Sequence, residues 1–176
     1  MGHRLKGVGM DLGRLLLRTA VGGLFVGHGL QKLAGWFGGG GPEGTRQFFS
    51  SLGLGRRNAT VAGLAEATGG SLLVLGLATP LSAAALTSVM LTAIRTVHLK
   101  KGPWNANGGY EYPAVLIAAL LALADGGPGG ISLDARLGME RRGAAWMASA
   151  AALGAAGSVL AVELGKREAA ESAPTA

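Results

Sequence analysis

Five apolar segments, separated by short polar or glycine-rich stretches, limit the folds available to this chain. In order they are Leu12–Leu33, Ala59–Ala78, Leu81–His98, Pro113–Ala124 and Gly143–Leu164. A helix needs about 20 apolar residues to cross a bilayer, and all but Pro113–Ala124 reach or approach that length. Only 15% of the residues are charged, whereas soluble domains average about 25%. The sequence therefore predicts a membrane protein built from helices.

The spacing of the segments predicts how these helices are connected. Only Thr79–Pro80 separates the second segment from the third, and proline can end one helix and open the next, so these two form a helical hairpin. In the fifth segment, small residues recur every four positions, which favours close packing against another helix. A peripheral amphipathic helix at the membrane surface is the alternative for that segment.

The predicted fold class is all-α: a multi-pass membrane four-helix bundle with a fifth, C-terminal helix. We expect residues 1–138 to form the four-helix membrane domain. Residues 139–165 form the extra helix, and residues 166–176 form a polar, disordered tail.

Charge and cysteine content exclude several classes of function. The net charge is +6, but the basic residues lie singly or in pairs between apolar segments, without the aromatic interleaving of a nucleic-acid site. We therefore expect no nucleic-acid partner. The chain has no cysteine, which excludes disulfides, thiol redox chemistry and thiolate-bound clusters. We predict no metal site, because no metal-ligand motif is present.

Ionisable residues concentrate at one side of the predicted bundle. If the first four segments all cross the membrane, the loops 35–58 and 100–109 lie on the same side, together with the helix ends next to them. Charged side chains inside membranes usually face the bundle interior. We therefore predict a polar pocket between the helices, with these lining residues: Arg18, His28, Lys32, Glu66, Arg95, His98 and Glu111.

Angular positions sharpen this prediction on the first segment. At about 100° per residue, Arg14, Arg18, His28 and Lys32 fall within an arc of about 80°. This polar stripe faces the bundle interior.

Glu66 is flanked by Ala62, Gly63, Gly69 and Gly70, which would let another helix approach closely. A lone carboxylate is costly in hydrocarbon, so a cation such as Lys32, Arg95 or Arg18 is expected to pair with it.

Each of these residues also has a structural interpretation. Glu66 is either an ion pair that holds helices together or a proton or ligand site, and Lys32 either pairs or snorkels to the interface. His28 and His98 either hydrogen-bond to neighbours or border a haem or a proton path. Haem is disfavoured because no ligand-spacing motif supports it. We assign no catalytic residue.

Four stretches of the chain together resemble the DoxX family of small bacterial membrane proteins. They are "LGRLLLRTAVGGLFVGHGLQKLAGWFGG" (12–39), "LAEATGGSLLVLGLATPLSAA" (64–84), "VHLKKGPWNANGGYEYP" (97–113) and "GGPGGISLD" (126–134). The resemblance implies a four-helix bundle in the bacterial inner membrane. It also implies a link to membrane oxidoreductases, to quinone or oxidative-stress systems, and to a partner oxidoreductase subunit or a homo-oligomer. The family core ends near Asp134, so the fifth segment departs from the family pattern.

The leading hypothesis is a membrane redox component, which would make the chain an oxidoreductase subunit and a quinone its ligand in the polar pocket. Since the chain has no cysteine, electrons would need a quinone, a haem or a partner subunit. Two alternatives remain open. One is a small-solute or proton-coupled carrier with Glu66 and the histidines as its relay. The other is a non-catalytic assembly subunit whose charges only pair helices.

Overall fold

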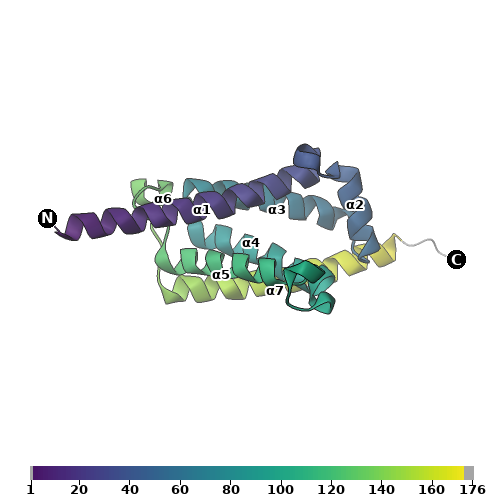
Figure 1. The fold of residues 1–176 in the computed structure, drawn as a ribbon. Helices are drawn as coiled ribbons and strands as arrows, with labels where there is room; N and C mark the ends of the chain where they lie inside the picture. Colours follow the sequence, from purple (N-terminus) through teal and green to yellow (C-terminus); the bar gives the residue numbers. More distant parts are fainter. Residues whose placement is uncertain (1, 173–176) are drawn as a thin grey trace.

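The computed structural model describes residues 2–172, and this part of the chain is helical without β-strands. Five long helices run side by side as a bundle (Figure 1). They are α1 (Gly2–Ala34), α3 (Arg56–Leu75), α4 (Thr79–Ala93), α5 (Glu111–Gly126) and α7 (Ala144–Glu171). The prediction of an all-α bundle with an added C-terminal helix is confirmed.

Shorter helices connect the long ones at the two ends of the bundle. Two of them, η1 (Trp36–Gly38) and α2 (Gly41–Ser51), join α1 to α3. A π-helical turn, η2 (Ile94–His98), extends α4 into η3 (Leu99–Lys101), and η4 (Asn105–Asn107) leads to α5. At the opposite end, α6 (Leu133–Arg136) lies between α5 and α7.

Glycines bring α1 against α3. A Cβ atom added at Gly22 would lie 2.7 Å from the carbonyl oxygen of Gly70, and one at Gly29 would lie 2.6 Å from the backbone nitrogen of Ala67. These distances are too short for any side chain, so the two backbones meet directly. The predicted close approach of a helix to the small residues around Glu66 is therefore confirmed, and the helix is α1.

The C-terminal helix packs on α4 by the same means. Ala150, Gly154 and Ser158, the small residues that recur at intervals of four, are all buried, and a Cβ atom at Gly154 would lie 2.7 Å from the side chain of Thr87. The helix continues through residues 166–171, where the sequence predicted a disordered tail. Residues 173–176 of that predicted tail lie outside the described part of the chain.

The turn between α3 and α4 is held by a residue distant in sequence. Ala78, with φ 49°, is left-handed and gives α4 no side-chain cap of its own. The buried carboxylate of Asp134 accepts hydrogen bonds from the backbone nitrogens of Ala78 (2.9 Å) and Thr79 (3.2 Å) instead. The start of α6 therefore caps the start of α4.

The outer surface of the bundle is apolar. Two helical stretches, Thr79–Lys101 and Ala144–Glu171, are long and apolar enough to cross a membrane. Large apolar side chains are exposed on every long helix, among them Leu16, Val61, Leu81, Val115 and Leu160. Such a surface is costly in water and suited to lipid.

Candidate functional site

A buried ion pair joins the C-terminal part of α1 to α3. The Nζ atom of Lys32 lies 2.6 Å from Oε2 of Glu66. The Glu66 side chain is 3% exposed and that of Lys32 is 24% exposed. Of the three cations predicted as partners, Lys32 is the one that pairs with this carboxylate. Because the glycine contacts bring the two helices together, the lysine reaches the carboxylate from the neighbouring helix.

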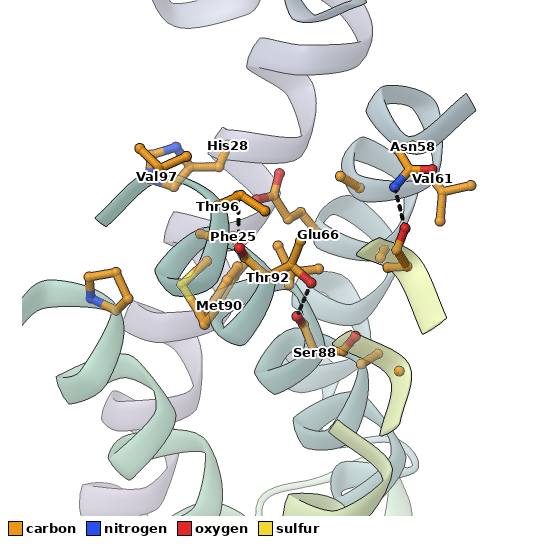
Figure 2. A pocket seen from close by; sticks show the side chains of 18 of the residues that line it. Phe25, His28, Asn58, Val61, Glu66, Ser88, Met90, Thr92, Thr96 and Val97 are labelled. Atoms are coloured by element: carbon orange, nitrogen blue, oxygen red, sulfur yellow. Dashed lines mark hydrogen bonds between the residues drawn. The ribbon is translucent and has the colours of Figure 1, made fainter. Parts of the chain in front are cut away.

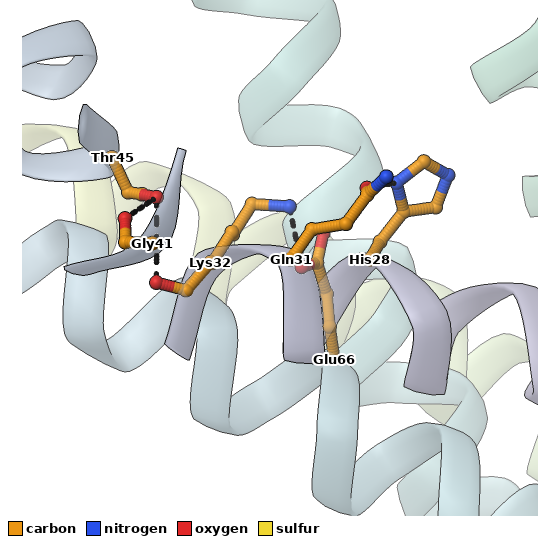
Figure 3. A network of polar contacts seen from close by, with 6 residues as sticks. All are labelled: His28, Gln31, Lys32, Gly41, Thr45 and Glu66. Carbon is orange, nitrogen blue, oxygen red and sulfur yellow. Dashed lines mark hydrogen bonds and ion pairs between the residues drawn. The ribbon is translucent and has the colours of Figure 1, made fainter. Parts of the chain in front are cut away.

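The pair belongs to a wider polar network at the end of α1 (Figure 3). Nδ1 of His28 lies 2.9 Å from Oε1 of Gln31, one turn before Lys32. The hydroxyl of Thr45 on α2 donates to the carbonyl of Gly41 (2.7 Å) and lies 3.5 Å from the carbonyl of Lys32. Helix α2 is thus attached to the last turn of α1, beside the ion pair.

A cavity of about 800 Å³ adjoins this network, and its lining is predominantly apolar (Figure 2). Six helices contribute to its wall: α1, α2, α3, α4, α5 and α7. Its ionisable lining residues are His28, Lys32, Glu66, His98 and Tyr112. A large apolar cavity with a few polar groups is the usual form of a site for a small organic ligand.

His98 belongs to the π-helical turn of η2, at the cavity wall. Its Nδ1 atom lies 2.7 Å from the carbonyl oxygen of Gly108. A ring nitrogen facing a carbonyl oxygen must carry a proton, so in the neutral ring Nε2 is the free acceptor. Single π-helical turns within α-helices are frequent at functional sites.

Four of the seven residues predicted for the pocket line this cavity: His28, Lys32, Glu66 and His98. Arg18, Arg95 and Glu111 do not. The structure does not bring these three residues to the cavity, and each has a different partner.

Arg18 lies near the opposite end of the bundle. It is buried, its Nη2 atom donates to the carbonyl oxygen of Ile131, and a Cβ atom at Gly76 would collide with its guanidinium. It shares the angular stripe of His28, as predicted. However, it lies ten residues earlier on the helix, which at 1.5 Å per residue is about 15 Å away.

Arg95 and Glu111 point away from the cavity. Arg95 is exposed, and its Nη1 atom lies 3.4 Å from the hydroxyl of Ser158 on α7. Glu111, also exposed, accepts a hydrogen bond from the backbone nitrogen of Asn105 (2.9 Å) and so orders the loop before α5.

Several lining residues were not identified from the sequence. Asn58 lies in the first turn of α3, and its Nδ2 atom donates to the carbonyl oxygen of Ala161 (2.7 Å). An amide in the first turn of an apolar helix is a weak signal, because such residues are common there. Phe48 and Phe49 both line the cavity, and Phe49 packs on Leu54 in a small core.

Comparison with known proteins gives two matches. The DoxX family model matches residues 13–99. A Bacillus subtilis (strain 168) protein named "Putative oxidoreductase CatD" is 39% identical over 113 residues, which cover 64% of this chain and 79% of that protein. The chain belongs to the DoxX family. No solved structure matches it.

The DoxX match places the site within the family core. Residues 13–99 include His28, Lys32, Glu66 and His98, the four predicted residues that line the cavity. The matched residues end before α5, α6 and α7. DoxX is a family of membrane proteins, which agrees with the apolar exterior of the bundle. The helix α7, outside the match, supplies one wall of the cavity.

The two histidines of this DoxX cavity each use one ring nitrogen in a hydrogen bond. Within residues 2–172, no group of three or more His, Asp and Glu side chains lies close enough to share a metal. His28 and His98 both line the cavity, and the partners of their Nδ1 atoms are Gln31 and Gly108 respectively.

Proposed function

We propose that this DoxX protein is a multi-pass protein of the bacterial inner membrane that binds a quinone in the cavity, as a component of a membrane redox system. One observation carries the proposal: an apolar cavity of about 800 Å³ has a buried lysine–glutamate pair in its wall. A quinone combines an apolar ring with two carbonyl oxygens, so it needs this combination of surfaces.

The polar end of the cavity offers donors for those oxygens. The ammonium of Lys32 has three N–H bonds, and the contact with Glu66 uses one. A hydrogen bond from a charged donor is stronger than one from a neutral donor. Phe25, which is 1% exposed, also lines the cavity, and its ring provides an apolar face for the ligand.

The redox part of the proposal is supported by the relative named as an oxidoreductase. Reduction of a quinone to a quinol consumes two electrons and two protons. We assign the electrons to a partner oxidoreductase subunit, since this chain has no cysteine that could carry them. His28 and Glu66 are the groups on the cavity wall that can pass protons to the quinone oxygens. A second copy of this chain is the alternative partner.

Equilibrium binding of a decyl-chain benzoquinone to the purified protein in lipid nanodiscs tests the proposal. The double variant Lys32→Met/Glu66→Gln removes the pair without leaving a buried charge unpaired. Losing a charge-assisted hydrogen bond should weaken binding about tenfold or more. The matched control is Arg56→Met/Glu43→Gln, which removes an exposed pair. Equal binding by both double variants would mean that the Lys32–Glu66 pair only holds α1 and α3 together.

A further inference from the structure

The cavity extends from the ion pair to the outer surface of the bundle between α3 and α7. Five of its lining side chains are more than half exposed: Val61 of α3 (61%), Leu81 of α4 (63%), and Leu153 (59%), Leu160 (59%) and Leu164 (51%) of α7. A side chain that lines a cavity and is also exposed marks a place where that cavity opens. We name this opening the α3–α7 slot.

The floor of the slot is α4. Ala85 and Ser88 line the cavity there, and a Cβ atom at Gly157 of α7 would lie 2.8 Å from the hydroxyl of Ser88. Helix α7 therefore rests directly on α4. Small side chains on both helices leave room for the cavity beside this contact.

One end of the slot is closed by hydrogen bonds between α7 and the start of α3. The backbone nitrogen of Gly55 donates to the carbonyl of Gly165 (2.9 Å), and Asn58 donates to Ala161. In addition, the carboxylate of Glu168 accepts from the backbone nitrogen of Arg57 (3.1 Å). These contacts fix the distance between the two helices at that end, while Val61 and Leu160 remain exposed beyond it.

The surface around the slot determines which ligands can enter it. Its walls and floor carry Val61, Ala65, Leu81, Ala85, Ser88, Leu153, Gly157 and Leu160, none of which is charged. In a bilayer, this apolar outer face of the bundle borders lipid tails. A molecule dissolved in the lipid can therefore reach the cavity sideways, whereas a soluble ion would have to leave water first.

We infer that the ligand of the cavity is a long-chain, lipid-dissolved quinone whose isoprenoid tail leaves the cavity through the α3–α7 slot. This inference rests on the proposed function and adds the substrate class and the route. The ring lies at the Lys32–Glu66 end, and the tail passes over Ala85 between Ala65 and Leu160. Helix α7 thereby becomes one of the two walls that select the tail.

Binding of two matched quinones to nanodisc-embedded protein tests the slot. The first ligand is a dimethoxy-methylbenzoquinone ring without a tail, and the second is the same ring with a decyl chain. Ala65→Phe and Ala85→Phe each place a bulky side chain in the slot, from α3 and α4. Ala152→Phe, on the exposed face of α7, adds the same bulk outside the cavity.

Both slot variants should weaken binding of the tailed quinone about tenfold or more, because its buried methylenes lose their site. Binding of the tail-less ring should stay within about twofold, as should both ligands in Ala152→Phe. Comparing each variant with wild type in the same nanodiscs cancels the partitioning of the tail into lipid. Thermal unfolding identifies a variant that does not fold, and one folded slot variant is sufficient.

The possible outcomes separate the two proposals. If the wild type binds both quinones and the folded slot variants bind the tailed one normally, the slot is wrong and the proposed function stands. Equal loss of both ligands in the slot variants would likewise refute a separate path for the tail. If neither quinone binds to the wild type, the proposed function fails, and this inference fails with it.

Discussion

Replacing Glu66 by glutamine keeps the size of the side chain but removes its charge. In the structure this leaves the ammonium of Lys32, 2.6 Å away, without its counterion. Breaking a fully buried ion pair costs about 3–5 kcal/mol. Because the Lys32 side chain is 24% exposed and can turn partly to solvent, we expect a loss below this range, about 2–3 kcal/mol.

For a chain of this size, that loss corresponds to a fall in Tm of about 4–12 °C. Thermal unfolding of the detergent-solubilised protein measures it. The matched control is Glu43→Gln, because Glu43 pairs with Arg56 at 3.2 Å and both side chains are at least 60% exposed. An exposed pair of this kind contributes less than about 1 kcal/mol, so the control should change Tm little.

A double-mutant cycle identifies the partner of Glu66. Adding Lys32→Met to Glu66→Gln removes the unpaired charge, so the double variant should be more stable than Glu66→Gln alone. Adding Arg95→Met should not restore stability, because Arg95 contacts Ser158 and does not line the cavity. The reasoning is refuted if Glu66→Gln unfolds at the same temperature as Glu43→Gln, or if Arg95→Met restores stability as well as Lys32→Met does.

Three further predictions concern the bundle. Gly29→Leu should destabilise the protein by about 1–3 kcal/mol or more, because the new side chain would collide with the α3 backbone. The control is Gly27→Leu, which should be tolerated because the space around Gly27 is open. Equal unfolding temperatures of the two variants would contradict the close packing of α1 on α3. Asp134→Asn should lower stability by about 1–2 kcal/mol through the weakened cap of α4, whereas an unchanged Tm would show that the cap is dispensable. Single cysteines introduced at Ser50 and Asn105, both exposed, should react with an impermeant maleimide from the same side of the membrane. If only one of them reacts in intact membranes while both react after solubilisation, the two loops do not lie on the same side.

The side of the bundle on which each helix end lies could be predicted, because successive helices cross a membrane in opposite directions. Once four crossings are assumed, His28, Glu66 and His98 must come to one end, and the structure places all three on the same cavity. The partner of Glu66 was less certain, since three cations were candidates. The glycines of α1 and α3 select Lys32 by bringing those two helices into contact.

Arg18, Arg95 and Glu111 do not line the cavity for reasons that helical periodicity alone does not describe. A helical wheel gives the direction of a side chain but not its depth in the bundle, so it groups Arg18 with His28 although Arg18 lies near the opposite end of the bundle, beside Ile131. Arg95 was placed only by the side of the membrane on which its helix ends, and that side does not say which neighbouring helix the side chain contacts. The partner of Glu111 is a loop nitrogen, and loop geometry is not encoded in periodicity.

The hydrogen bonds between α7 and the start of α3 also bear on the order of assembly during synthesis. The ribosome produces the segments of α1 to α5 before that of α7, so the early helices are made without this wall. Until α7 arrives, the small-residue face of α4 around Thr87 remains uncovered, and the backbone nitrogens of Gly55 and Arg57 have no acceptor from α7. The cavity that the first helices begin is therefore completed only after the C-terminal helix has been made and docked.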